Sequence, residues 1–156
     1  LSSLPTPYGI GTMGQCAREF IDFLKKSGQK YWQILPIGQT GYGDSPYQSF
    51  SSFAGNPYFI DLDMLAGKGL LERSEFECRN WGTNLKVVDY GLLYEKRYPL
   101  LKLAVERFLA GEQKGFGEFC AEHAGWLEDY ALFMAIKGKN NGVSWLEWSD
   151  GDQGHK

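Results

Sequence analysis

The sequence predicts an α/β fold in which helices alternate with short strands. Apolar residues recur with helical spacing over 17–24, which indicates an amphipathic helix. The aromatic and β-branched run at 31–35 follows directly and ends at Pro36, which is typical of a buried strand. A second run of this kind lies at 58–62. A helix that leads directly into a strand is half of an alternating α/β unit.

The composition excludes several classes of protein. A chain of 156 residues is long enough for one domain, and 15% aromatic residues are too many for a disordered chain. The net charge of −3 lacks the basic excess of a nucleic-acid-binding protein. The longest apolar run, at 130–136, is far shorter than the ~20 residues that a membrane span needs. We therefore expect neither nucleic acid nor a membrane as a partner.

The first expected element is a glycine-rich loop that leads into the first helix. Gly9, Gly11 and Gly14 match the G-x-G-x-x-G pattern of dinucleotide-binding proteins, which also requires a preceding strand. Pro5 and Pro7 disfavour a central strand at that place. We therefore interpret the three glycines as a turn at the helix N-terminus.

A loop at 38–57 separates the two expected strands. It is dense in glycine, serine and aromatic residues. Loops of this length in compact domains are usually functional or disordered, and the aromatic residues favour order. After the strand at 58–62, we expect a short helix or turn at 65–71 and irregular chain over 72–89.

The second half of the chain is expected to be helical. An apolar period of 3.6 residues over about 92–109 predicts a long helix. If this helix starts near Arg97, Pro99 falls in its first turns, where proline is tolerated. Two further helices are expected at 116–123 and 126–134.

Few residues offer metal or nucleophilic chemistry. His123 and His155 have no second ligand at metal-binding spacing, and we interpret His123 as a helix-surface residue. The three cysteines are widely spaced and form no known motif, which favours thiols in a reducing cytoplasm. Asp61 and Asp63 are interpreted as solvated carboxylates or turn caps. We expect no metal, nucleotide or organic cofactor.

The loop at 38–57 is the best candidate for a binding site. Tyr42 and Tyr47 supply flat aromatic faces that suit the C–H face of a pyranose ring. Asp44 and Ser45 supply polar groups for the hydroxyls of a sugar. Serine and aspartate are also ordinary turn residues, and Tyr47 could pack in the core, so both interpretations stay open.

Six blocks along nearly the whole chain carry a family resemblance. The most distinctive is Thr-Gly-Tyr-Gly-Asp-Ser-Pro-Tyr-Gln-Ser at 40–49. The other five blocks lie at 1–11, 31–36, 53–58, 88–91 and 126–133. In this order they resemble the 4-α-glucanotransferases, the amylomaltase or disproportionating-enzyme family.

This resemblance implies a partial (β/α)8 TIM barrel with an inserted helical subdomain. The family transfers α-1,4-glucan segments between glucan acceptors by a retaining double displacement, which needs two carboxyl groups about 5–5.5 Å apart. In the family these carboxylates lie downstream of the matched region. We therefore assign no catalytic residue here and expect this chain alone to be inactive. The implied partners are α-1,4-glucans, such as maltooligosaccharides and amylose, in starch or glycogen metabolism.

The resemblance also implies five substrate-binding residues. Tyr47 resembles the tyrosine that stacks under the sugar at the cleavage subsite, and Ser45 resembles a residue that lines the adjacent glucan path. Tyr42 and Tyr94 resemble a pair at a second glucan-binding groove beside the active site. Without the resemblance, Tyr94 would be interpreted as a residue that packs a helix against its neighbours. Asp44 is either a sugar contact or an Asx turn that orients the loop.

The resemblance also sets the expected organisation. The start of the barrel and the substrate loop would occupy about 1–65, and a mostly helical insertion about 66–156. We expect the chain to be incomplete at both ends and the protein to be cytoplasmic. Two alternatives stay open, namely a non-catalytic α-glucan-binding module with a similar loop and a related α-glucan hydrolase.

Overall fold

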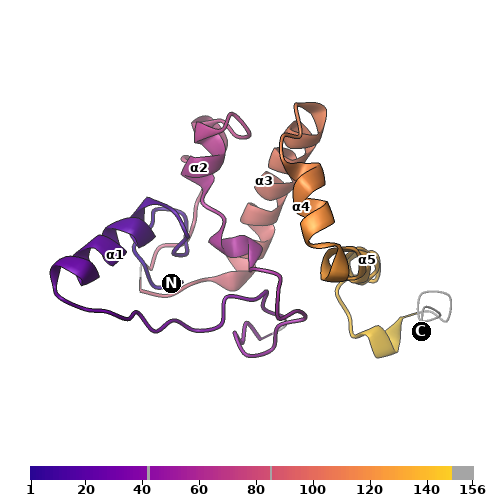
Figure 1. The fold of residues 1–156 in the computed structure, drawn as a ribbon, viewed down its shortest axis with the longest axis horizontal. Helices are drawn as coiled ribbons and strands as arrows, with labels where there is room; N and C mark the ends of the chain where they lie inside the picture. The colour runs from indigo at the N-terminus through magenta and orange to yellow at the C-terminus, as the bar shows by residue number, and fades with distance from the viewer. Residues whose placement is uncertain (42, 85, 149–156) are drawn as a thin grey trace. The chain divides into compact units, whose positions relative to one another are not determined.

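The chain divides into two compact units, Leu1–Glu112 and Gln113–Lys156, in a computed structural model (Figure 1). The structure describes residues 1–41, 43–84 and 86–148. Unit 1 contains the first three α-helices and unit 2 contains the last two. In chain order the α-helices and 3₁₀ helices are α1 (Gln15–Lys26), η1 (Pro57–Phe59), α2 (Leu62–Gly67), η2 (Arg73–Glu75), α3 (Tyr90–Ala110), α4 (Phe116–Glu122), α5 (Ala124–Lys139) and η3 (Trp145–Glu147).

Helix α3 supplies much of the core of unit 1. Its buried face packs against the N-terminal loop, the η1–α2 segment and the irregular chain around Phe76 and Trp81. Phe76 and Leu62 have no exposed surface. The buried cluster consists of Tyr8, Ile10, Tyr58, Leu62, Leu71, Phe76, Trp81, Leu93, Leu100, Leu101 and Ala104. Helix α3 therefore holds together segments that lie far apart in the sequence.

A buried arginine connects α3 to two of these segments. The Arg97 side chain has no exposed surface, and its Nη1 donates to the carbonyl of Tyr8 at 3.3 Å. Its Nη2 donates to the carbonyl of Ile60 at 2.5 Å. Burial lowers the pKa of Arg97 to about 10, so the guanidinium keeps its charge at neutral pH. The two carbonyls therefore stabilise a buried cation and fix the position of α3.

Close backbone approaches explain the glycines of the N-terminal loop. A Cβ at Gly11 would collide with the carbonyl of Leu1, and a Cβ at Gly14 would collide with the carboxylate of Asp61. Gly14 is also the N-cap residue of α1. These glycines therefore form a turn at the helix N-terminus, as the sequence predicted.

The expected helices form, but two starts differ from the prediction. Helix α3 begins at Tyr90, because the Asp89 carboxylate accepts a hydrogen bond from the backbone N–H of Leu92 at 2.9 Å. Pro99 therefore lies inside α3 and not in its first turns, where an interior proline costs roughly 3 kcal/mol. The burial of Leu93, Leu100, Leu101 and Ala104 along the same helix offsets this cost. Helix α2 begins at Leu62, earlier than expected, because Asp61 caps it.

Neither expected strand forms in the described residues. The segment at 31–35 has no regular secondary structure and pairs with no strand in the described chain, and Tyr31 is 92% exposed. The segment at 58–62 is divided between η1 and α2, because Asn56 and Asp61 cap the backbone N–H groups of Tyr58 and Met64. The β pairing in the described part is one isolated antiparallel bridge between Gly38 and Gly55.

Unit 2 contains α4, α5 and η3, and aromatic rings contact one another along its two α-helices. His123 joins α4 to α5, and its ring lies 4.5 Å from that of Phe119 and 5.7 Å from that of Trp126. Trp148 is buried and its Nε1 donates to the carbonyl of Val143 at 3.2 Å.

Within the described chain, no helix combines the length and the apolar character of a membrane span.

An ion pair fastens the C-terminal half of α3 to η2. Both guanidinium Nη atoms of Arg107 donate to the Glu75 carboxylate, at 2.7 and 2.8 Å. Glu75 also accepts from the backbone N–H of Glu72 at 2.7 Å and so completes a capping box. The hydrogen bonds from Arg107 and Glu72 lower the pKa of Glu75 to about 2.

We expect Arg97→Met to lower the free energy of unfolding by about 2–4 kcal/mol, because the carbonyls of Tyr8 and Ile60 lose a buried donor. Urea unfolding of the intact protein measures this change. Lys102→Met changes an exposed residue of the same helix and should stay within about 0.5 kcal/mol of wild type. An Arg97→Met protein as stable as the Lys102→Met protein would contradict the role of the buried guanidinium.

We expect acid to destabilise the protein partly through Glu75. Its folded-state pKa lies below its ordinary value of 4.5, so its stabilising contribution is complete above pH 4.5 and is lost as the pH falls towards 2. Unfolding free energies measured across this window should therefore fall less steeply for Glu75→Gln than for wild type. Equal slopes for the two proteins would show that the Arg107 pair does not hold the carboxylate ionised.

Candidate functional site

The loop at 38–57 is closed at its base by backbone contacts. Gly38 and Gly55 form an antiparallel bridge, and the N–H of Asn56 donates to the carbonyl of Ile37 at 2.8 Å. Gly38 lies against Ser49, so that a Cβ at this glycine would collide with the serine hydroxyl. The two ends of the loop therefore meet in a single base.

Serine side chains organise the interior of the loop. The hydroxyl of Ser49 donates to the carbonyl of Ser51 at 2.9 Å. The hydroxyl of Ser51 accepts from the N–H groups of Phe53 and Ala54 at 3.0 and 3.1 Å. These side-chain to backbone bonds replace the pairing that a strand would provide, so the loop is ordered as the sequence predicted.

The two residues expected at the glucan path, Ser45 and Tyr47, adjoin on this loop. Tyr47 is 74% exposed, so it does not pack in the core of the described chain. The hydroxyl of Ser45 accepts from the N–H of Tyr47 at 3.4 Å and shapes the turn between them. The aromatic face of Tyr47 is thus presented to solvent by local hydrogen bonding. Whether either residue contacts a glucan stays a prediction.

Helix α3 presents the other expected aromatic residue beside a cluster of rings. Tyr94 is 69% exposed, and its ring centroid lies 5.3 Å from that of Tyr98, one helical turn later. Tyr98 in turn lies 5.4 Å from Tyr58, which is 6% exposed and follows the loop directly. Both ring pairs are edge-to-face, an arrangement that aromatic quadrupoles favour. An exposed ring is therefore supported by a half-buried ring and a buried ring.

Polar residues of the loop also reach this cluster. The Gln39 side-chain amide donates to the Tyr98 hydroxyl at 3.3 Å. Burial is the main cause that raises the pKa of Tyr58 and of Tyr90, and the Asp44 carboxylate adds to both shifts. Burial also raises the pKa of Asp44, which has a left-handed backbone with φ of 56°. The Asp44 carboxylate therefore acts electrostatically on both phenols.

Four of the five residues predicted to bind glucan lie in the described chain. Asp44, Ser45 and Tyr47 lie on the loop, whereas Tyr94 lies on α3 beside the Tyr58 ring cluster. Tyr47 is 74% exposed. Tyr42 lies outside the described residues.

Two residues that support the candidate site, Gln39 and Tyr98, were not predicted from the sequence. Gln39 and Tyr98 meet across a separation of 59 residues, which no local pattern reveals. The spacing of four between Tyr94 and Tyr98 was the available sign, since residues at i and i+4 share a helix face.

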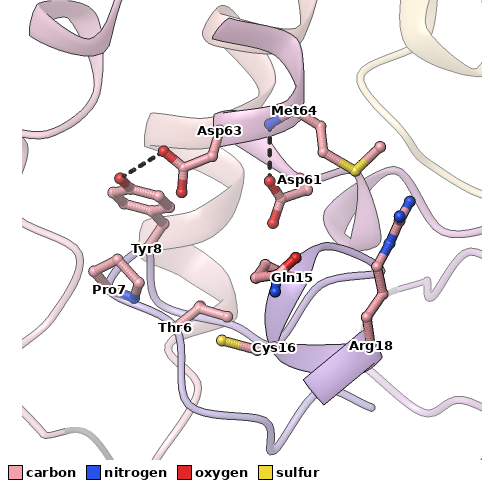
Figure 2. A pocket seen from close by; sticks show the side chains of 9 residues that line it. All are labelled: Thr6, Pro7, Tyr8, Gln15, Cys16, Arg18, Asp61, Asp63 and Met64. Atoms are coloured by element: carbon pink, nitrogen blue, oxygen red, sulfur yellow. Dashed lines mark hydrogen bonds between the residues drawn. The ribbon is translucent and has the colours of Figure 1, made fainter. Parts of the chain in front are cut away.

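A cavity of about 320 Å³ lies apart from this loop in unit 1, between the N-terminal loop, α1 and α2 (Figure 2). Figure 2 shows the hydroxyl of Tyr8 pointing at Asp63, to which it donates at 3.4 Å, and Asp61 capping Met64. Cys16 also lines the cavity, and the Cys16 thiol donates to the carbonyl of Pro5. Asp44, Ser45, Tyr47 and Tyr94 are not among the residues that line this cavity.

The chemistry of this cavity does not favour nucleophilic catalysis. Burial raises the pKa of the Cys16 thiol, and the carboxylates of Glu19, Asp61 and Asp63 raise it further. The thiol therefore stays protonated and weakly nucleophilic at neutral pH. Both aspartates already have partners, because Asp61 accepts from the Thr12 hydroxyl and Asp63 pairs with Arg73 at 2.8 Å. Asp61 is a helix cap, as the sequence predicted, whereas Asp63 pairs with Arg73, which the sequence did not predict.

Comparison with known proteins identifies the family. The profile of a glycoside hydrolase family described as 4-alpha-glucanotransferase matches residues 1–155. The chain belongs to the 4-alpha-glucanotransferase family. The resemblance seen in the sequence is thereby confirmed.

Individual 4-alpha-glucanotransferases match almost the whole chain. The enzyme of Clostridium butyricum is 54% identical over 149 residues, which cover 96% of this chain and 31% of that protein. The enzyme of Thermus thermophilus is 52% identical over 94% of this chain and 29% of that protein. A solved amylomaltase of Streptococcus agalactiae, in complex with acarbose, is 44% identical with a TM-score of 0.91 over 96% of this chain and 30% of that one. The chain thus spans about 30% of the length of these relatives.

We expect Gly38→Ala to loosen the loop at 38–57, because the new Cβ would collide with the Ser49 hydroxyl. Chymotrypsin cleavage next to the exposed Phe53 should become about tenfold faster, which corresponds to an opening free energy lowered by about 1.4 kcal/mol. Gly55→Ala is the matched control, since a Cβ on the other side of the same bridge meets open space. Equal cleavage rates for the two variants would contradict the proposed packing of the loop base.

Proposed function

We propose that the protein transfers α-1,4-glucan segments between glucan acceptors, and that this chain contributes glucan-binding residues. Membership of the 4-alpha-glucanotransferase family supports the reaction. The observation that carries the binding role is the exposed ring of Tyr47 on an ordered loop, which also holds Ser45 and Asp44. Helix α3 adds Tyr94, and we keep Tyr42 in the same set.

The reaction we propose is a retaining double displacement with a glycosyl-enzyme intermediate. It needs one carboxylate as nucleophile and one carboxylic acid as acid/base, about 5–5.5 Å apart. Asp61, Asp63 and Glu75 have structural partners, namely a helix N-terminus, Arg73 and Arg107. We therefore place the catalytic carboxylates in the part of the relatives' length that this chain does not span.

Tyr47 would hold the sugar whose bond is broken. A tyrosine face packs against the C–H groups of a pyranose ring and fixes its orientation towards the nucleophile. A glucan must accept the glycosyl group in place of water, so a bound acceptor that excludes water is part of the mechanism. The serines and Gly38 keep the loop in one conformation and so lower the cost of ordering on binding.

The same assignment sets the fold and location that we propose. The run at 31–35 would be a strand of a (β/α)8 barrel, whose sites lie at the C-terminal ends of its strands. The loop at 38–57 would then open on the active-site face. We propose barrel for about 1–65 and helical insertion for about 66–156. The free thiols of Cys16, Cys78 and Cys120 favour a reducing cytoplasm.

Incubation of the intact protein with maltotriose tests the reaction. A transferase releases glucose and forms longer maltooligosaccharides without an increase in the number of reducing ends. A related hydrolase would increase the number of reducing ends, and a non-catalytic binding module would leave maltotriose unchanged. Either of those results would overturn the proposal.

We expect Tyr47→Ala in the intact protein to lower kcat/KM for maltooligosaccharides by more than tenfold, because stacking at the reacting sugar strengthens in the transition state. Tyr47→Phe keeps the ring and should stay within about threefold of wild type, because it loses only a hydroxyl. Initial rates of glucose release measure both values. An unchanged kcat/KM in Tyr47→Ala would remove Tyr47 from the site.

A further inference from the structure

Tyr98 of α3 contacts both ends of the loop at 38–57. Its hydroxyl accepts from the side-chain amide of Gln39 at 3.3 Å, next to the Gly38 end of the loop. Its ring lies edge-to-face with Tyr58, 5.4 Å away, just beyond the other end. Because the bridge between Gly38 and Gly55 joins these ends, Tyr98 is bound to the base of the loop as a whole.

The same ring also supports Tyr94. The two tyrosines lie one helical turn apart, with centroids 5.3 Å apart and an interplanar angle of 60°. Tyr94 is 69% exposed, so most of its ring faces solvent and its orientation depends on the ring beneath it. The direction of Tyr94 is therefore linked, through Tyr98, to the base of the loop.

We infer that Tyr98 is a positioning residue that sets the Tyr94 ring for long α-glucans. The inference rests on the proposed function, in which Tyr94 and the loop both bind glucan, and it adds that one long glucan reaches both. An exposed tyrosine that samples several rotamers loses that freedom when a sugar binds, which weakens binding. The hydrogen bond from Gln39 holds Tyr98 in place, and Tyr98 holds the Tyr94 ring before the glucan arrives.

The role predicts a dependence on the length of the glucan. Tyr47 and Ser45 lie on the loop itself, whereas Tyr94 lies on α3, so only a glucan long enough to reach α3 uses the positioned ring. Loss of the Tyr98 hydroxyl should therefore weaken the binding of long glucans and leave the binding of short glucans unchanged. A general loss of structure would weaken the binding of both.

The experiment compares amylose with maltotriose as substrates of the intact protein. In Tyr98→Phe, KM for amylose should rise about fivefold, the size expected when one hydrogen bond is lost. KM for maltotriose and both kcat values should stay at the wild-type level. Gln39→Leu removes the same bond from the loop side and should give the same pattern.

A double-mutant cycle tests whether Tyr98 acts through Tyr94. Tyr94→Ala should itself raise KM for amylose, and adding Tyr98→Phe to it should cause no further rise, because the ring to be positioned is gone. Tyr90→Phe is the matched control. It removes a hydroxyl from the same helix and from a ring that also contacts Tyr58, without touching the Gln39 bond.

Each result decides whether Tyr98 positions the Tyr94 ring or only supports the structure. An amylose-specific rise that disappears in the Tyr94→Ala background supports positioning. An additive effect, an equal loss with maltotriose, or no effect in either Tyr98→Phe or Gln39→Leu overturns it. If the wild-type protein transfers glucan while these variants behave like Tyr90→Phe, only this inference fails, whereas a wild type without transfer overturns the proposed function as well.

Discussion

The architecture of unit 1 depends on one buried cation. Arg97 lies in the middle of α3, and its two hydrogen bonds reach the carbonyls of Tyr8 and Ile60. A charged group without exposed surface is tolerated only where fixed dipoles replace water. The two carbonyls must therefore stay in place, which fixes α3 against the N-terminal loop and the chain before α2.

The candidate site follows from that placement of α3. Tyr94 and Tyr98 lie on the same helix as Arg97, and the ring contact with Tyr58 brings them to the end of the loop at 38–57. Local bonds of the serines give the loop its own shape, and the Gln39 bond attaches it to the helix. Tyr47 on the loop and Tyr94 on the helix both have exposed aromatic rings, which the proposed binding of an extended sugar chain requires.

The sequence predicted what depends on neighbours along the chain. Apolar residues recur with helical spacing in α1, α4 and α5, and glycines form the turn before α1. Both patterns are local, and the structure confirms the elements that they predict. The apolar period predicts α3 from about 92, close to its observed start at Tyr90, whereas the conditional start near Arg97 is wrong because Asp89 caps the helix. The apolar composition of 58–62 predicts a strand, but the caps of Asn56 and Asp61 favour helical turns.

Contacts between distant segments account for the rest. Arg97 meets Tyr8 across 89 residues, and Gln39 meets Tyr98 across 59, so neither pair leaves a pattern in the sequence. Short apolar runs such as 31–35 are also ambiguous, because a strand is defined by a neighbour that the run itself does not encode. The proposed glucan-binding residues on the loop rest mainly on the family resemblance.

The close approach of Gly14 and Asp61 has a consequence for variation in this family. The carboxylate that caps α2 occupies the space where any side chain at position 14 would begin. A larger residue at 14 is therefore compatible only with a shorter residue at 61, and any such residue other than serine or glycine would weaken the cap of α2. The two positions should change together during evolution, so their covariation records a steric contact that is independent of glucan chemistry.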